Sequence, residues 1–172
     1  MIPVPPLEFD EDLYVKQEGE LIYSHYLMNN VLHANYVYMK DFFLKTQRRT
    51  AIDVGCRYGE YTHYLLHDFM QLKCFEPNPA VLHNFNRNIP KEKVQVWDCG
   101  IGEIDEIVDM SGSLVVNEIN AKLRNPAKTR SGIQILPLDS FNFSDVDFIK
   151  IDVEGQELRV LKGAVETIQI YR

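Results

Sequence analysis

The residues best suited to chemistry lie in Thr50–Gly59, where a short apolar strand runs into a glycine-containing turn. The strand carries one carboxylate, Asp53, and the turn contains Gly55 and Gly59. Glycine lets a backbone approach a ligand closely, and the helix N-terminus behind such a turn offers amide groups to it. Glu76 ends a second apolar strand. Because α/β folds hold an adenosine between such a turn and such an acid, which accepts from the ribose hydroxyls, we predict a nucleoside-cofactor site.

The order of residues in the turn indicates which cofactor it takes. A dinucleotide fingerprint reads G-x-G-x-x-G, whereas this turn reads D-x-G-x-x-x-G, with Asp53 two residues before the first glycine. An acid there would repel a pyrophosphate but suits a cationic amine, such as the methionine part of S-adenosylmethionine. We expect Asp53 to hold the loop backbone or to reach the ammonium through water. A nicotinamide-dependent oxidoreductase is the alternative. The third glycine of the dinucleotide fingerprint is missing, however. Tyr36-x-x-x-Lys40 matches the catalytic pair of short-chain dehydrogenases, but it lies before the glycine turn, whereas that family has it after the turn.

Four sequence blocks, in this order, resemble the FkbM-type methyltransferase family: Asp53–Gly59, Phe75–Pro79, Leu138–Phe141 and Asp147–Leu158. The last block is the most family-specific, and the resemblance covers roughly residues 48–170. It implies a class I S-adenosylmethionine-dependent methyltransferase that acts on a hydroxyl of a small molecule or glycan. One departure is that Cys56-Arg57 stands where the family usually has Ala-Asn.

The expected cofactor residues follow the first three strands of the sheet. Asp98 comes after the third strand, where it could accept from the exocyclic amine of adenine. We predict no metal site, because His63 and His67 have ligand spacing but no matching third ligand. The full set of expected cofactor contacts is Asp53, Gly55, Cys56, Arg57, Tyr58, Gly59, Glu76, Pro77, Asn78, Asp98 and Cys99.

Three charged residues, Lys150, Asp152 and Glu154, alternate at the end of another apolar strand and are the candidate catalytic residues. Alternation in a strand places them on one side, at the edge of a parallel sheet where ligands bind. Asp152 could orient the acceptor hydroxyl or take its proton. Glu154 could do the same or cap the next helix, and Lys150 could pair with either acid. The alternative is a charged cluster that only fixes the loop.

Composition narrows the classes of partner. The chain has 172 residues and a formal net charge of −7, which disfavours nucleic acid and anionic membranes as partners. The N-terminus lacks signal-peptide features, and three cysteines without a C-x-x-C pair fit a reducing compartment, so we expect a cytoplasmic protein. One local basic run could be a solvated surface or could receive an acidic acceptor; it comprises Lys122, Arg124, Lys128 and Arg130.

Strands alternate with helices, which predicts an α/β domain with a Rossmann-like, mostly parallel sheet and helices on both faces. We expect residues 1–49 to form an N-terminal arm and helix, the helix over 21–46, and residues 50–172 to form the cofactor-binding domain. The expected strands are 51–54, 72–75, 94–97 and 146–151, the helices 59–68, 79–88 and 156–170, and a hairpin-like insertion uses 104–108 and 133–136.

Only four core strands can be counted, whereas the class I methyltransferase fold has seven. The apolar strand 146–151 would then lie at a sheet edge, and exposed edges tend to be paired or covered. We therefore expect a homo-oligomer formed through this edge. A non-catalytic, truncated methyltransferase-fold module is the alternative to an enzyme.

Overall fold

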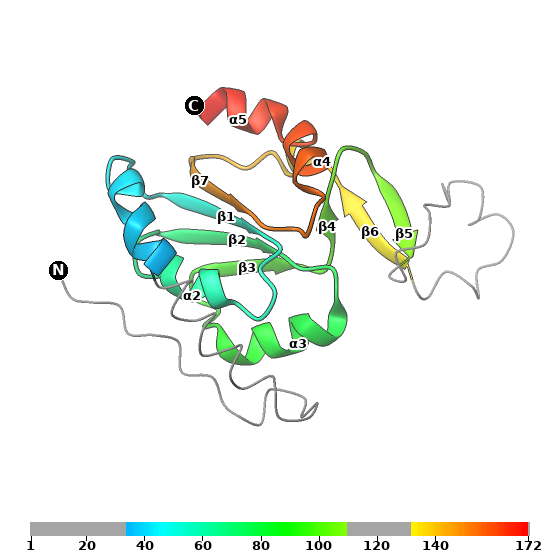
Figure 1. Ribbon diagram of the computed structural model, residues 1–172, viewed down its shortest axis with the longest axis horizontal. Coiled ribbons are helices and arrows are strands. Elements are labelled where there is room, and N and C mark those ends of the chain that lie inside the picture. Colours follow the sequence, from blue (N-terminus) through cyan, green and yellow to red (C-terminus); the bar gives the residue numbers. More distant parts are fainter. Residues whose placement is uncertain (1–33, 110–131, 172) are drawn as a thin grey trace, which may run out of the picture.

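The computed structural model describes residues 34–109 and 132–171 (Figure 1). Residues 34–43 are helical. The expected arm, the first part of the helix at 21–46, and the basic run all lie outside the described residues. The further elements are β1 Thr50–Val54, α2 Glu60–Leu65, β2 Gln71–Phe75, α3 Pro79–Asn88, β3 Val94–Trp97, β4 Gly100–Ile101, β5 Glu106–Asp109, β6 Gly132–Leu136, η3 Leu138–Phe141, β7 Val146–Ile151, α4 Glu157–Lys162 and α5 Val165–Tyr171.

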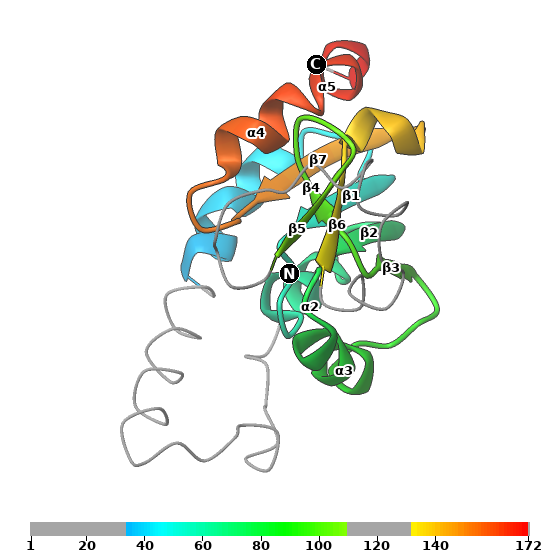
Figure 2. The ribbon, with the colours of Figure 1, turned by 90° about the vertical axis from the view of Figure 1, so that its right-hand side faces the viewer.

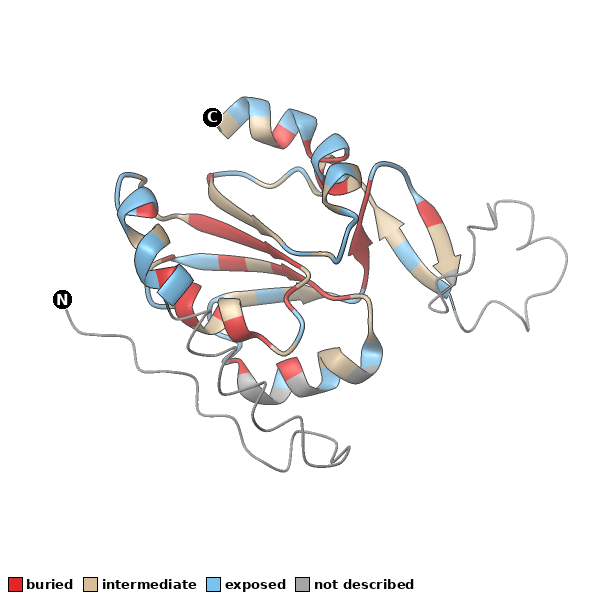
Figure 3. Cartoon of the chain, in the orientation of Figure 1, coloured by how far each residue is buried: buried red, intermediate tan, exposed pale blue. Residues whose placement is uncertain are grey.

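The main sheet has four parallel strands in the order β3-β2-β1-β7. β1 lies between two neighbours and all five of its residues are buried (Figure 3). Its register pairs Asp53 with Cys74 on one side and with Lys150 on the other. The parallel α/β sheet predicted from the sequence is confirmed, and it brings the ends of β1, β2 and β7 to one edge.

Helices cover both faces of this sheet, as predicted (Figure 2). Successive side chains of a strand point to opposite faces, so Ala51 packs with Tyr64 and Phe85 of α2 and α3 in one core cluster. Ile52 packs in a second cluster, with Val160 of α4. The helical residues 34–43 join the first cluster, and η3 and α5 join the second. No helix in the described ranges is long and apolar enough to span a bilayer.

A second, three-stranded sheet has the order β4-β6-β5. The antiparallel pairing of β5 with β6 confirms the hairpin-like insertion, although β5 begins at Glu106 rather than at residue 104. The short strand β4 and the 3₁₀ helix η3 were not predicted. An ion pair between buried Glu106 and Arg159 attaches this sheet to α4.

The single helix predicted over 156–170 is wrong, because the chain breaks it into α4 and α5 at Gly163. A Cβ on Gly163 would lie 1.9 Å from the carbonyl oxygen of Gly102, so the glycine permits a close backbone approach. Asp139 then caps the start of α5, accepting from the amides of Glu166 at 3.0 Å and Thr167 at 2.9 Å.

The break changes which side chains of these helices face inward. Leu158, Leu161, Val165 and Ile168 would share one face of an unbroken helix, but the first three are 66%, 44% and 44% exposed. Ile168 does pack against the second core cluster.

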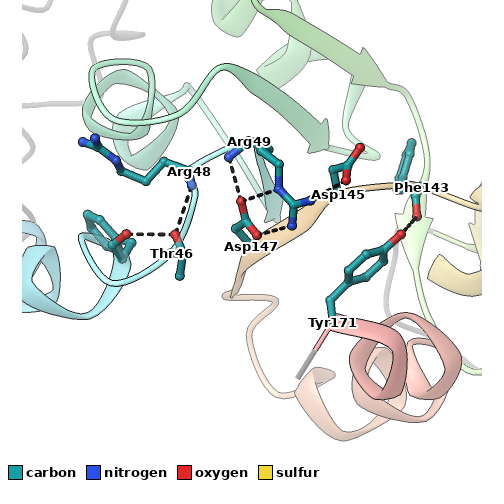
Figure 4. A network of polar contacts seen from close by, with 8 residues as sticks. Thr46, Arg48, Arg49, Phe143, Asp145, Asp147 and Tyr171 are labelled. Carbon is teal, nitrogen blue, oxygen red and sulfur yellow. Dashed lines mark hydrogen bonds and ion pairs between the residues drawn. The ribbon is translucent and has the colours of Figure 1, made fainter.

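The start of β7 is joined to β1 by an arginine–aspartate network (Figure 4). Asp147 accepts from the backbone amide of Arg49 at 2.7 Å and from its Nη2 at 2.7 Å, and the same guanidinium contacts Asp145. These contacts lie beside a register shift between Thr50 and Ala51. Among the described strands β7 has a neighbour on one side only, so its position at an edge agrees with the sequence, and pairing with a second chain stays a prediction.

We predict that Asp147→Asn lowers the melting temperature at neutral pH by a few degrees, ~2–4 °C. The hydrogen bond from Arg49 lowers the pKa of the Asp147 carboxyl. A depressed carboxyl pKa contributes stability above the unfolded-state pKa of about 3.9, and this is lost as pH falls through the folded value. Thermal melts from pH 7 to pH 2 should therefore converge for the two proteins. Asp145→Asn, at a half-exposed carboxylate, should cost less, and a pH-independent difference for Asp147→Asn would contradict this account.

Candidate functional site

A cavity of about 380 Å³ opens at the carboxyl ends of β1, β2 and β7. Its size falls within the ~300–1,000 Å³ of small-molecule pockets, and its place is where open α/β sheets bind ligands. Three chain segments line it: the turn and first residues of α2 after β1, the loop and start of α3 after β2, and the segment after β7. The lining residues are Gly55, Cys56, Arg57, Glu60, Tyr61, Glu76, Pro77, Asn78, Val81, Lys150, Asp152, Val153 and Glu154.

The cavity brings together many of the expected site residues. Six of the expected cofactor residues line it, namely Gly55, Cys56, Arg57, Glu76, Pro77 and Asn78, and so do the three candidate catalytic residues, Lys150, Asp152 and Glu154. Five expected cofactor residues lie outside the lining: Asp53, Tyr58, Gly59, Asp98 and Cys99. Sequence reasoning missed Glu60, Tyr61, Val81 and Val153. The place of Glu60 and Tyr61, in the first helical turn after the glycines, is the signal that could have identified them.

Gly55 is required by the packing of the chain itself. Its φ is +74°, and a Cβ there would lie 2.1 Å from the carbonyl oxygen of Asp152. Its amide donates to the carbonyl of Phe75 at 3.0 Å. The turn after β1 therefore touches both the end of β2 and the segment after β7, and any side chain at this position would displace the residue that carries the candidate base.

Gly59 serves the packing of α3. With φ at +96° it precedes α2, and a Cβ there would lie 2.4 Å from Ile89. Gly59 does not line the cavity, and its contact with the cofactor stays a prediction.

Glu76 presents a fixed carboxylate at the end of β2. Its Oε1 accepts from the amide of Asn78 at 2.8 Å and its Oε2 from the amide of Arg57 at 3.1 Å. Burial raises the pKa of this carboxyl, against the lowering effect of the two amides. A carboxylate has about four acceptor sites, so the two amides leave capacity for two vicinal hydroxyls. The arrangement fits the predicted contact with a ribose.

Lys150 pairs with Asp53, not with Asp152 or Glu154 as the sequence suggested. Its Nζ lies 3.0 Å from Oδ1 of Asp53 and donates to the carbonyl of Gly55 at 2.7 Å. The ammonium also lies 5.4 Å from the ring centroid of Tyr61, a cation–π distance. Burial alone would lower the pKa of Lys150, but Asp53 outweighs it and the pKa is raised.

Asp53 is fully buried beneath this contact. Its Oδ2 accepts from the hydroxyl of Thr62 in α2 at 2.7 Å. The carboxylate therefore holds Lys150 and α2, and does not line the cavity. Of the two roles expected from the sequence, holding the loop is the one that this geometry supports.

The segment after β7 leaves two carboxylates at the cavity. Asp152 and Glu154 are exposed, and the backbone of Asp152 is anchored by its amide, which donates to the carbonyl of Val54 at 3.1 Å. Glu154 does not cap α4, because the residue at the N-cap position is Gln156, which makes no side-chain capping hydrogen bond. Glu157 instead fixes the preceding segment, accepting from the amides of Val153 at 3.2 Å and Gly155 at 3.1 Å.

Among the described cysteines, Cys56 lines the cavity and Cys74 belongs to the first core cluster. Cys99 belongs to the second core cluster, where burial raises its thiol pKa to about 11, and Asp98 beside it is exposed. Burial also raises the pKa of the Cys56 thiol. No group of three potential metal ligands occurs within residues 34–109 and 132–171. Tyr36, the tyrosine of the Tyr36-x-x-x-Lys40 motif, donates a hydrogen bond from its hydroxyl to the carboxylate of Asp68.

The Asp53–Lys150 ion pair generates a stability prediction. Removing one partner of a buried pair leaves an uncompensated charge and costs about 3–5 kcal/mol, so Lys150→Met should lower the free energy of unfolding by that amount. In the double variant Asp53→Asn/Lys150→Met the loss should be smaller than the sum of the two single losses. Urea unfolding of all four proteins measures this cycle. Additive losses, or a Lys150→Met variant within 1 kcal/mol of the wild type, would rule out the pair as a structural anchor.

Comparison with known proteins gives the chain its family. The family model described as "Methyltransferase FkbM domain" matches residues 53–172. A curated relative, "Methyltransferase 1" of Beauveria bassiana (strain ARSEF 2860), is 28% identical over 141 residues, which cover 65% of this chain and 57% of the relative. The chain thus spans less than two thirds of that relative's length.

Two similar solved structures are described as methyltransferases. SAM-bound CalS10, an amino pentose methyltransferase from Micromonospora echinaspora, is 17% identical with a TM-score of 0.38 and matches 49% of this chain and 37% of its own. The putative RNA methyltransferase PH1948 from Pyrococcus horikoshii is 12% identical with a TM-score of 0.40 and matches 70% and 61%.

The family match begins at Asp53, runs through every segment that lines the cavity, and covers well over half of the chain. The chain therefore belongs to the FkbM methyltransferase family, and S-adenosylmethionine is the cofactor that this membership assigns to it.

Proposed function

We propose that this domain binds S-adenosylmethionine and methylates a hydroxyl group of a small molecule or glycan. The observation that carries the proposal is the shared cavity. Glu76, a carboxylate fixed by two amides, and Asp152, an exposed carboxylate, line the same 380 Å³ space. One acid can hold the cofactor while the other meets the acceptor.

The loop after β1 and the start of α3 would hold the adenosine part of the cofactor. Glu76 accepts hydrogen bonds from the ribose hydroxyls, and Pro77 and Val81 add apolar surface beside it. Gly55 keeps the loop backbone close to the segment after β7. When bound, S-adenosylmethionine supplies a methyl group activated by its positively charged sulfur.

Asp152 would act on the acceptor. Its carboxylate would accept a hydrogen bond from the acceptor hydroxyl and would take its proton, so that the oxygen could receive the methyl group that bound S-adenosylmethionine supplies. Alignment of the reacting atoms can supply ~7–11 kcal/mol of the barrier, and a positioned base adds roughly 10²–10⁴-fold. Lys150 is a positioning residue, because its ammonium is already engaged by Asp53 and Gly55. Glu154 also lines the cavity and would be the second acid near the acceptor.

Calorimetric titration of the wild-type protein with S-adenosylmethionine and with NAD separates the proposal from its alternatives. We expect saturable binding of S-adenosylmethionine and none of NAD. Binding without methyl transfer to any of a panel of sugars, phenols and aliphatic alcohols would favour the non-catalytic module. Binding of neither ligand would reject the proposed cofactor site.

We predict that Glu76→Gln weakens the binding of S-adenosylmethionine by about 1.5–3 kcal/mol, the usual worth of hydrogen bonds to a charged group. Glutamine retains one acceptor oxygen for the neighbouring amides, so the loop should keep its shape. Calorimetry measures the affinity, and Glu103→Gln, at an exposed glutamate paired with Lys162, is the matched control. Unchanged affinity would remove the ribose contact from Glu76.

We predict that Asp152→Asn leaves the affinity for S-adenosylmethionine within about twofold but lowers turnover by 10²-fold or more, as expected for loss of a positioned acid–base group. Its melting temperature should stay at the wild-type value, because Lys150 pairs with Asp53 instead. Methyl transfer to the best acceptor of the panel gives the rate, and Asp105→Asn, at an exposed aspartate just before β5, is the control. Normal turnover would exclude Asp152 as the base.

A further inference from the structure

Glu60, the first residue of α2, is a buried carboxylate in the cavity wall that the proposed reaction has not used. Its relative exposure is 8%, similar to that of Glu76, and both acids line the cavity. Burial raises the pKa of the Glu60 carboxyl above the ordinary glutamate value. A buried carboxylate is costly unless it is paired, so its partners decide whether it is structural.

The Glu60 carboxylate has two backbone amides and one distant cation as partners. Its Oε2 accepts from the amide of Tyr58 at 3.1 Å, and a hydrogen bond from its own backbone amide also lowers its pKa. Its Oε1 lies 3.7 Å from Nη1 of Arg57, which is longer than a hydrogen bond. The Arg57 side chain is 46% exposed, and ion pairs with such an exposed group are weak. Oε1 therefore has a distant cation as its charged neighbour, and Glu60 is a lining residue of the cavity.

The cofactor offers a cation that fits this oxygen. S-adenosylmethionine carries an α-ammonium on its methionine part, and the sequence pointed to Asp53 as the acid near it. The structure encloses Asp53 under Lys150 and Thr62, outside the lining of the cavity. Within the described loop after β1, Glu60 is the acid that reaches the cavity. Asp152 and Glu154 lie on another wall and are solvent-exposed, where an ammonium–carboxylate contact is worth less.

Arg57 also links Glu60 to Glu76, the acid proposed to hold the ribose. Arg57 donates its amide to Glu76 and directs its guanidinium toward Glu60. The two buried acids thus flank one loop residue, Glu76 at the end of β2 and Glu60 at the start of α2. A ligand with its ribose on Glu76 would extend its amino-acid part along this loop.

We propose that Glu60 binds the α-ammonium of the cofactor's methionine part, in the role that the sequence assigned to Asp53. This inference rests on the proposed function, since it requires S-adenosylmethionine in this cavity. The ammonium would lie beside Oε1 of Glu60 and would neutralise the negative charge that the distant Arg57 guanidinium neutralises only in part. Glu60 would then be a binding residue that favours ligands with an amino-acid part over adenosine thioethers that lack it.

The test is a calorimetric comparison of three ligands on the full chain: S-adenosylmethionine, S-adenosylhomocysteine and 5′-methylthioadenosine, which lacks the amino-acid part. In Glu60→Gln the first two should bind at least tenfold more weakly, whereas 5′-methylthioadenosine should bind within twofold of the wild type. Glutamine keeps an oxygen for the Tyr58 amide, and thermal melting checks the fold. Glu76→Gln should weaken all three ligands, and Glu103→Gln none.

Glu60→Asp is the second variant, in case Glu60→Gln does not fold, because it keeps the charge and withdraws the carboxylate by one methylene. It should also weaken only the two ligands that carry an ammonium. The inference is overturned if all three ligands lose affinity equally, if none does, or if the selective loss appears in Asp152→Asn instead. A wild-type protein that binds none of the three overturns the proposed function together with this inference, whereas wild-type binding without the selective loss overturns this inference alone.

Discussion

The candidate site depends on one buried ion pair, between Lys150 of β7 and Asp53 of β1. The two residues are register partners on neighbouring parallel strands, and their charged groups lie 3.0 Å apart with side-chain exposures of 10% and 0%. The lysine also donates to the carbonyl of Gly55, and the aspartate accepts from Thr62. The pair therefore joins the central strand, the edge strand, the cofactor loop and α2 at one point.

This junction determines which acids are available for chemistry. Because Lys150 neutralises Asp53 below the cavity, its ammonium is not paired with Asp152, whose carboxylate stays exposed at the cavity. Gly55 then allows the loop after β1 to touch the backbone of Asp152. The loop proposed to bind the cofactor and the segment proposed to position the acceptor are thus in direct backbone contact. Both lie at the same edge of the sheet, where open parallel sheets bind ligands.

The sequence predicted the sheet well because apolar strands with glycine or proline boundaries leave a strong local signal, and β3, α3 and β7 have the predicted bounds. Its place at the end of a strand correctly predicted that Glu76 lies at the site, where it lines the cavity. The sequence-based prediction failed where contacts between distant parts of the chain determine the structure. Gly163 breaks the last helix because a distant backbone, that of Gly102, approaches it. Asp53 and Lys150 both carry motif-like signals, but only the strand register shows that they neutralise each other. Glu60 had no signal beyond its place after the glycine turn.

The most direct measurement of the central claim is a crystal structure of the chain with S-adenosylhomocysteine. The account predicts the adenosine between the loop after β1 and the start of α3, with both ribose hydroxyls within hydrogen-bond distance of Glu76 and with Lys150 still on Asp53 and Gly55. A ligand bound away from Glu76, or a Lys150 ammonium that leaves Asp53 to contact Asp152, would contradict it.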